Sequence, residues 1–344
     1  MKRIVSTIAL GAAMSFGATM ALAQTPGRTT LQNIQAKGFI QCGVTQGLAG
    51  FSMPDSAGNW TGMDVDFCRA LAAAVFNDPS KVRFSPLSAK DRFTALQSGE
   101  IDVLSRNTTW TLQRDTSLGL NFSVINYYDG QGFMVRKSLN VKSARELSGA
   151  SVCVQTGTTT ELNVADFFRA NNLKYEPVVF ATADETVKAY DAGRCDSYTA
   201  GVGALAGQRI KLRNPGEHTI MTELISNDPQ GPVTRWGDER WQAIVRWVLN
   251  GMIAAEHLGV TSKNVDEMRT NSRNAEIRRL LGADGNFGAM LGLDNAWMFN
   301  AIKQVGNYSE SYERTVGKGS PLGLERGSNQ LWTRGGLLFT PPFQ

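Results

Sequence analysis

The feature that most constrains the fold of this chain is a short pattern that occurs twice. Residues 97–102 and 191–196 both combine the end of a helical stretch, a glycine, a short turn and an aspartate that opens a strand-like segment. Glycine is the usual residue at a left-handed helix C-cap, and helices alternating with strands are typical of layered α/β proteins. The repeat therefore predicts two similar lobes, each built on a mainly parallel sheet.

Strand-like and helix-like segments alternate along the chain in the same way. Strands are expected at 39–44, 82–84, 101–104, 151–155 and 178–180, and helices at 64–76 and 159–171. Capping-box spacing at residues 143–146 and 182–185 predicts two more helix starts. At 344 residues the chain also exceeds the usual size of one compact unit, which favours two lobes over a single core.

The expected boundaries follow from these segments. Lobe 1 is predicted to comprise residues 28–134 together with 232–344, and lobe 2 residues 135–231. The chain would cross between the lobes near 134–136 and 228–233. Helices are expected at 264–268, 276–281 and 294–305, in a C-terminal extension whose role the sequence does not indicate.

The N-terminus has the pattern of a secretory signal peptide. Lys2 and Arg3 precede an apolar run that ends in the small-residue pattern Ala21-Leu22-Ala23. We expect residues 1–23 to be removed after Ala23, leaving an exported, periplasmic protein; a membrane anchor is the alternative. Without the two basic residues the net charge is 33 minus 31, or +2, too low to indicate nucleic-acid binding.

Export to an oxidising compartment favours disulfides among the four cysteines. Spacing alone allows three pairings. Cys42 lies on an expected strand and Cys68 on the helix that follows it, while Cys153 and Cys195 lie on or beside strands of the second half. We therefore expect Cys42–Cys68 and Cys153–Cys195. Metal binding is the alternative, but the chain has no C-x-x-C and only two histidines, so neither a metal nor a cofactor is expected.

The repeat also indicates where a ligand would bind. In open α/β sheets ligands bind beyond the carboxyl ends of the strands, and five residues after each repeated aspartate lie Asn107 and Gly201. The loop after the first strand leads to Arg114, which can hold a carboxylate with two hydrogen bonds. In lobe 2, Thr158 and Thr159 join a strand to a helix start, which also attracts anions. Taken singly, Arg114 could form a surface ion pair and Thr158 could merely cap the helix.

Several longer motifs resemble one subfamily of bacterial binding proteins. They comprise residues 42–48, 54–55, 64–70, 93–99, 105–111, 129–133, 157–161, 231–233, 304–308 and 335–337. The chain is similar in these segments to the periplasmic general L-amino-acid-binding proteins of polar amino acid ABC transporters, over almost its whole mature length. The resemblance implies a two-lobed, type II periplasmic-binding-protein fold that closes on its ligand. It also implies an inner-membrane ABC permease as partner and a monomeric binding protein.

The same resemblance implies roles for individual residues. Arg114 would bind the α-carboxylate of an amino acid with help from Thr109 and the amide of Thr159, and the Asn107 carbonyl and Thr109 hydroxyl would meet the α-ammonium. Gly201 stands where relatives have an acid that completes the ammonium site. Either a carboxylate ligand without an α-ammonium is bound, or an acid such as Asp129 or Asp228 replaces the missing one.

Enzymatic function finds little support in the sequence. The chain contains no G-x-S-x-G, no G-x-x-x-x-G-K-[ST] and no H-E-x-x-H motif. The strongest enzyme alternative is a periplasmic dehydratase on the same fold, which would need an acidic residue in the cleft. We expect a non-enzymatic protein that captures an amino acid or related small carboxylate.

Overall fold

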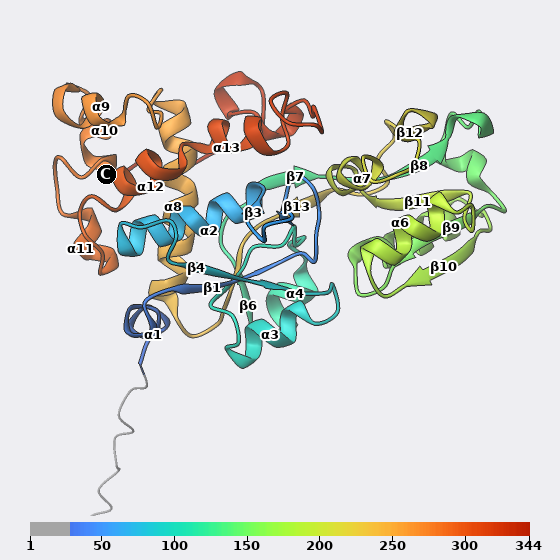
Figure 1. Ribbon diagram of the computed structural model, residues 1–344, viewed down its shortest axis with the longest axis horizontal. Coiled ribbons are helices and arrows are strands. Elements are labelled where there is room, and N and C mark those ends of the chain that lie inside the picture. Colours follow the sequence, from blue (N-terminus) through green and yellow to red (C-terminus); the bar gives the residue numbers. More distant parts are fainter. Residues whose placement is uncertain (1–27) are drawn as a thin grey trace, which may run out of the picture.

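Two five-stranded sheets form the cores of two lobes in the computed structural model, which describes residues 28–344 (Figure 1). The first sheet has the order β4-β1-β5-β14-β6, and its strands are β1 (Ile40–Val44), β4 (Val82–Pro86), β5 (Val103–Leu104), β6 (Leu120–Phe122) and β14 (Val233–Arg235). The second has the order β10-β9-β11-β8-β12, with β8 (Gln131–Arg136), β9 (Ser151–Gln155), β10 (Glu176–Phe180), β11 (Ser197–Gly201) and β12 (His218–Ile220). In both sheets three parallel strands are followed by one antiparallel strand, β14 or β8, and the fifth strand pairs antiparallel with it. The predicted two-lobed α/β fold is confirmed.

Helices cover both sheets. Those of lobe 1 are α1 (Thr30–Lys37), α2 (Met63–Phe76), α3 (Arg92–Ser98), α4 (Leu112–Ser117) and α8 (Glu239–His257). Those of lobe 2 are α5 (Thr159–Ala170), α6 (Ala183–Asp191) and α7 (Val202–Arg209), with short 3-10 turns η1 (Lys137–Leu139), η2 (Ala144–Leu147) and η3 (Pro215–Glu217). The capping box expected at Thr182 is present, whereas Ser143 caps only the short turn η2. No helix among residues 28–344 is long and apolar enough to cross a membrane.

The repeated sequence pattern has the same structure in both lobes. Gly99 and Gly193 both adopt a left-handed conformation, with φ of 81° and 82°. Each following aspartate then accepts a hydrogen bond from a backbone amide of the neighbouring parallel strand segment: Asp102 Oδ2 from Gln41 at 2.7 Å, and Asp196 Oδ2 from Ser151 at 2.8 Å. The two aspartates thus fix the register between β1 and β5 and between β9 and β11.

Two antiparallel strands run between the lobes, β7 (Tyr127–Asp129) and β13 (Asp228–Gln230). The first crossing therefore lies before the expected position at 134–136, which falls inside β8 and pairs with β11 and β12 in lobe 2. The sequence conceals this boundary because only Gly130 separates β7 from β8, so a crossing strand and a sheet strand form one continuous segment. The second crossing lies within the expected range 228–233.

Both expected disulfides are present, and each lies within one lobe. Cys42 on β1 is bonded to Cys68 on α2, with Cα atoms 6.4 Å apart. Cys153 on β9 is bonded to Cys195, directly before β11, with a Cα separation of 5.6 Å. Each bond joins a strand to a segment that packs against it, as the alternating pattern indicated.

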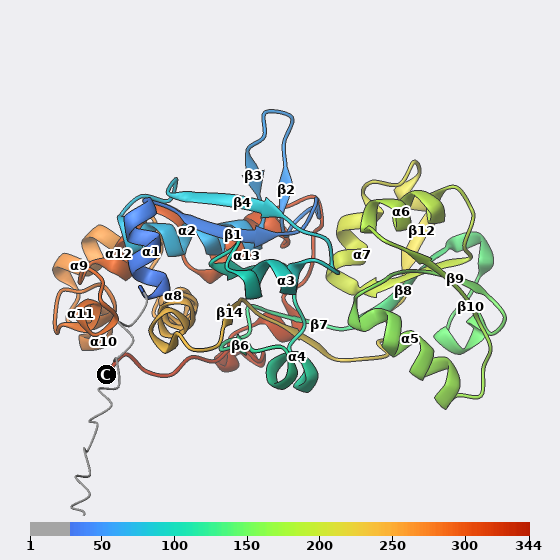
Figure 2. The ribbon, with the colours of Figure 1, turned by 90° about the horizontal axis from the view of Figure 1, so that it is seen from below.

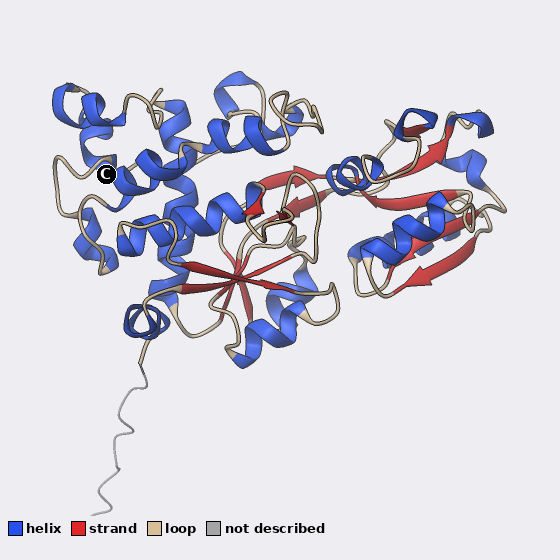
Figure 3. Ribbon diagram, in the orientation of Figure 1, coloured by secondary structure: helices blue, strands red, loops and turns tan. Residues whose placement is uncertain are grey.

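The C-terminal extension covers lobe 1 on the side away from lobe 2 and reaches back toward the crossing strands (Figures 1 and 2). Figure 3 shows it as helices joined by loops: α9 (Val265–Asn271), α10 (Ala275–Leu280), α11 (Phe287–Leu291), α12 (Trp297–Val305), α13 (Tyr308–Thr315), η4 (Gly327–Asn329) and η5 (Trp332–Arg334). Its buried side chains continue the core formed by α2 and α8. A small hairpin, β2 (Met53–Pro54) and β3 (Trp60–Thr61), projects from the same lobe in Figure 2.

Candidate functional site

A cavity of about 270 Å³ lies between the lobes. Lobe 1 contributes residues that follow β1 and β5, lobe 2 residues that follow β9 and β11, and β13 contributes two side chains. The lining residues used below are Arg92, Arg106, Asn107, Thr109, Thr158, Thr159, Gly201 and Asp228. The loops beyond the carboxyl ends of both sets of parallel strands therefore meet at one place, as expected for an open α/β sheet.

On the lobe 1 side, a buried aspartate shapes the loop that carries Asn107 and Thr109. Asp64, at the start of α2, accepts hydrogen bonds from the Ser105 hydroxyl and the Asn107 amide, both at 3.1 Å. Burial raises the pKa of Asp64 to about 6, although these hydrogen bonds lower it. Asn107 has a φ of 34°, a conformation that residues other than glycine rarely adopt. The bond to Asp64 holds this strained turn where the loop enters the cavity.

On the lobe 2 side, the cavity meets the N-terminus of α5. Thr158 is the N-cap, and its hydroxyl accepts a hydrogen bond from the Glu161 amide at 3.3 Å. Thr158 is thus a cap and a lining residue at once. The first amides of a helix lack intrahelical acceptors, and the helix dipole favours an anion beside them. Thr159 and Thr160, the first two residues of α5, supply such amides to the cavity wall.

The two lobes are in contact across the cavity. The hydroxyls of Thr109 and Thr159 are 3.4 Å apart, so the structure brings together two residues predicted to share a carboxylate. Farther along the cleft, Lys211 Nζ of lobe 2 donates to the Gly47 carbonyl of lobe 1 at 2.8 Å. These two contacts join the lobes across the cleft, as in a closed arrangement.

Arg114 lies behind this surface and is not among the residues that line the cavity. Its Nη1 donates to the Thr109 carbonyl at 2.8 Å, and its guanidinium carbon lies 5.2 Å from the centre of the Phe93 ring. Burial lowers its pKa to about 10, while the charge of Asp228 acts in the opposite direction. The structure thus places Arg114 next to the predicted carboxylate site, where it supports the loop of Thr109.

A second arginine, which sequence analysis missed, forms part of the wall. Arg92, the first residue of α3, is only 3% exposed, and its Nε has no hydrogen-bond partner within residues 28–344. Its nearest acceptors, the Thr108 hydroxyl and the Gly157 carbonyl, are both 3.5 Å away. Burial, together with the charges of Arg106 and Arg114, holds its pKa well below the ordinary value. A cation in the first turn of a helix is unfavourable because it opposes the helix dipole. This unusual position is the one sequence feature that could have indicated Arg92 as a candidate site residue.

The structure also shows what occupies the space beside Gly201. A Cβ atom at Gly201 would lie 2.3 Å from Asp129 Oδ2, so the glycine makes room for the aspartate of β7. Asp129 accepts hydrogen bonds from the amides of Gly130 and Gly203 and from the side chain of Gln230. Burial and the neighbouring Asp228 raise its pKa to about 7. An acid from the crossing strands therefore occupies the space next to the position at which an acid was expected.

Asp228 is the second member of this pair. It stands opposite Asp129 in the β7–β13 register and lines the cavity itself. Burial raises its pKa, whereas a hydrogen bond from Ser226 and the charge of Arg114 lower it. Among residues 28–344, His, Cys, Asp and Glu side chains nowhere form a group of three or more that could hold a metal ion. Asp228 thus brings a carboxylate to the cavity lining, and Asp129 lies beside it, outside the lining.

Two similar α/β lobes, two crossing strands and a cavity lined by residues of both lobes define a two-lobed solute-binding protein. Comparison with known protein families identifies the family to which this chain belongs. The chain belongs to the bacterial extracellular solute-binding proteins, family 3, whose family model matches residues 40–271.

Individual relatives are similar over more of the chain. The general L-amino acid-binding periplasmic protein AapJ of Rhizobium johnstonii is 57% identical, with 99% of both chains covered. The glutamate/glutamine/aspartate/asparagine-binding protein BztA of Rhodobacter capsulatus is 51% identical over 92% of this chain and 94% of its own length. A solved periplasmic binding protein from Brucella ovis with glutathione bound shares 55% identity and a TM-score of 0.91, covering 92% of this chain and all of the other. The extension beyond residue 271 is therefore shared with close relatives.

Proposed function

We propose that this protein captures an L-amino acid between its lobes in the periplasm and delivers it to the permease of an ABC transporter in the inner membrane. The observation that carries the proposal is the polarity of the closed cavity, which has anion donors on both lobes and an acid pair on the crossing strands. An α-amino acid carries both charges, a carboxylate and an ammonium group, on the same carbon atom. AapJ and BztA, named as amino-acid-binding proteins, support the same ligand class.

In the proposed complex the α-carboxylate lies between Thr109 and the first amides of α5, with Arg114 contributing its charge from behind the loop. The α-ammonium donates to the Asn107 carbonyl, to the Thr109 hydroxyl and to Asp228. Asp129 adds negative charge from the space beside Gly201. This arrangement favours the interpretation that Asp129 and Asp228 replace the missing acid, over the alternative that the ligand lacks an ammonium group. A buried ammonium needs a compensating carboxylate, and these two residues supply it.

The rest of the cavity favours a ligand with a second anionic or strongly accepting group. Arg92 and Arg106 line the cavity, and within residues 28–344 neither forms an ion pair with a carboxylate. Glutamate and aspartate would place a side-chain carboxylate near these guanidinium groups, and glutamine and asparagine a carbonyl oxygen. The names of BztA and of the glutathione-bound Brucella protein agree with a ligand that is polar at both ends.

Isothermal titration calorimetry tests the ligand class. We expect L-glutamate, L-aspartate and L-glutamine to bind tightly, and 2-oxoglutarate and 2-hydroxyglutarate, which lack the α-ammonium, to bind at least tenfold more weakly. Tighter binding of the two deaminated acids would overturn the proposed role of Asp129 and Asp228. A thermal-shift screen extends the comparison to other metabolites, because a ligand that binds only the folded state raises the melting temperature.

The remaining parts of the proposal are export, the monomeric state and binding without catalytic turnover. The signal peptide and the cleavage after Ala23 lie outside the described residues; N-terminal sequencing of the exported protein tests them, and light scattering tests the monomeric state. Incubation with cyclohexadienyl acids followed by chromatography tests the dehydratase alternative. We expect no product, and catalytic turnover would contradict a purely binding role.

A further inference from the structure

The C-terminal extension makes direct contact with a crossing strand. The side-chain amide of Asn329, in η4, pairs with both backbone groups of Tyr128 in β7: Oδ1 accepts from the Tyr128 amide at 2.7 Å, and Nδ2 donates to its carbonyl at 3.0 Å. The other edge of β7 pairs with β13. Asn329 thus occupies the place of a third strand beside the crossing.

A buried ion pair holds Asn329 in this position. Arg326 donates to the Asn329 carbonyl through Nε at 2.9 Å and through Nη2 at 2.8 Å, and Nη2 also bonds Glu256 on α8 at 3.1 Å. The side chains of Arg326 and Glu256 are 8% and 4% exposed. The rings of Tyr308 and Tyr312 lie about 5 Å from the guanidinium. Asn329 is therefore anchored to lobe 1 through its own backbone.

Two tyrosine hydroxyls add to the attachment. Tyr308, in α13, donates to the Asn126 carbonyl at 2.7 Å, immediately before β7. Tyr128 donates to the Leu337 carbonyl at 3.1 Å, in the loop that follows η5. Three separate points of the extension thus hold the lobe 1 end of one crossing strand.

This attachment restricts which backbone dihedrals of the crossing strand can change. Two-lobed proteins open and close through changes in backbone dihedrals at a few residues of the crossing segments. Because both backbone groups of Tyr128 are bonded to the extension, we expect changes in backbone dihedrals along this strand to occur at Asp129 and Gly130. Asp129 belongs to the acid pair beside the ligand cavity, so the strand that moves also carries ligand-binding charge.

We propose that Asn329, seated by Arg326 and Glu256, is a positioning residue that ties β7 to lobe 1 and limits how far the ligand-free lobes open, because it removes Tyr128 from the residues whose backbone can rotate. The inference rests on the proposed binding function. It gives the C-terminal extension a role in ligand affinity, beyond covering the core of lobe 1.

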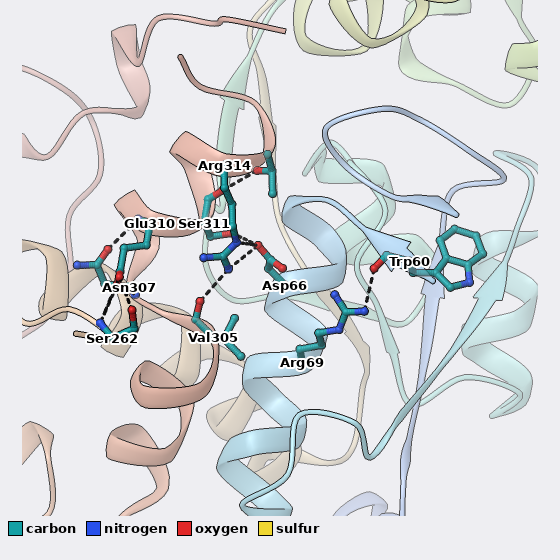
Figure 4. A network of polar contacts seen from close by, with 10 residues as sticks. Trp60, Asp66, Arg69, Ser262, Val305, Asn307, Glu310, Ser311 and Arg314 are labelled. Atoms are coloured by element: carbon teal, nitrogen blue, oxygen red, sulfur yellow. Dashed lines mark hydrogen bonds and ion pairs between the residues drawn. The ribbon is translucent and has the colours of Figure 1, made fainter. Parts of the chain in front are cut away.

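A second attachment of the extension supplies a matched control. Ser311, in α13, donates to Asp66 on α2 at 2.8 Å, and Arg314 donates to the same carboxylate (Figure 4). This contact docks the extension on lobe 1, and its partners are Asp66 and neighbouring groups rather than β7. Ser311→Ala should therefore weaken the docking of the extension without loosening the crossing strand.

The test compares wild type, Asn329→Ala, Asn329→Asp and Ser311→Ala as full mature chains. For Asn329→Ala we expect L-glutamate to bind about tenfold more weakly, with faster dissociation, and X-ray scattering to give a larger ligand-free radius of gyration that returns to the wild-type value with ligand. Asn329→Asp, which keeps only the acceptor for the Tyr128 amide, should fall between. Ser311→Ala should lower the melting temperature while leaving affinity and radius unchanged.

Either of two results would overturn the inference: unchanged affinity and radius in Asn329→Ala, or an equal loss of affinity in Ser311→Ala. Failure of the proposed function has a different signature. If wild type binds no amino acid, the ligand assignment is wrong. The ligand-free radii of the variants then still show whether Asn329 restrains the crossing strand.

Discussion

At the residue scale, three guanidinium groups cluster on the lobe 1 side of the cleft, and they have different partners. Arg114 bonds the Thr109 carbonyl and Arg106 the Leu87 carbonyl, whereas Arg92 has only long contacts. A buried donor without a partner costs free energy, which a ligand oxygen can recover. Arg114 and Arg106 therefore each support a loop carbonyl, although Arg106 also lines the cavity, whereas Arg92 has no hydrogen bond of ordinary length to the described part of the chain.

Arg114→Ala should remove most of the affinity for an L-amino acid while the protein remains folded. Losing one side of a buried, charge-assisted interaction costs about 2 to 5 kcal/mol, roughly 30-fold to several thousand-fold in affinity. Calorimetry with L-glutamate measures the loss, and circular dichroism checks the fold. Arg106→Ala serves as the comparison, with a smaller expected loss; wild-type affinity in Arg114→Ala would exclude Arg114 from the carboxylate site.

Gly201→Ala should weaken ligand binding, because the added Cβ would lie 2.3 Å from Asp129 Oδ2 and must displace that carboxylate. Overpacking of this kind costs about 1 to 3 kcal/mol, and we expect affinity for L-glutamate to fall roughly tenfold, about 1.4 kcal/mol. Gly216→Ala is the matched control, since a Cβ there would meet nothing within 4 Å. Equal affinities in the two variants would show that Asp129 is not needed beside Gly201.

At the scale of single elements, the repeated helix–glycine–aspartate pattern could be interpreted correctly because its helix end, glycine cap and strand start are local. Glycine accepts the left-handed C-cap without steric cost, and the aspartate bonds an amide of the neighbouring strand in both lobes. The short turn η2 shows the limit of such patterns. Ser143 and Glu146 have capping-box spacing, yet only a 3-10 turn forms there.

The disulfide of lobe 2 should contribute strongly to stability. It closes a loop of 42 residues, for which the chain-entropy model predicts about 4 kcal/mol. The double variant Cys153→Ala/Cys195→Ala should lose about that much free energy of unfolding in urea, and Cys42→Ala/Cys68→Ala, with a separation of 26, slightly less. Peptide mapping without reduction checks the pairing. Bonds between the lobes, or an unchanged urea midpoint in both variants, would contradict it.

At the scale of the whole molecule, buried acids at the cleft link the stability of the fold to pH. Burial raises the pKa of Asp129 to about 7 and that of Asp64 to about 6, from an ordinary value of 3.8. Between about pH 4 and 7 the folded protein therefore binds more protons than the unfolded chain. By linkage, the free energy of unfolding falls as the pH rises through this window.

Ligand binding should respond to pH in the opposite direction. An α-ammonium interacts favourably with ionised Asp129, so affinity for L-glutamate should increase from pH 5.5 to 8, while the melting temperature of the ligand-free protein decreases. Calorimetry and thermal unfolding over this range test the two trends. Asp129→Asn, which keeps the shape without the titration, should flatten the trend in affinity and reduce the trend in melting temperature, of which Asp64 keeps a part. The same slopes in that variant would assign the pH dependence to other groups.

The sequence by itself determined the class of fold, both disulfides and most of the loops that line the cavity. These features depend on short-range patterns: glycine caps, alternation of strand and helix, and the rule that ligands lie beyond the carboxyl ends of parallel strands. Asn107, Thr109, Thr158, Thr159 and Gly201 all line the cavity for that reason. Residue-level roles carried over from the resemblance remain predictions that the variants above test.

Only the tertiary structure decided which distant residues share the cleft. Asp129 lies beside Gly201, Arg92 lies in the cavity wall, and Asn329 bonds a strand about 200 positions earlier in the chain. The boundary between β7 and β8 was equally invisible, because pairing partners and not the local pattern separate them. The same physical reason applies to the three side chains and to the strand boundary. Each acquires its role from the group packed against it, and packing brings together segments that are far apart in the sequence.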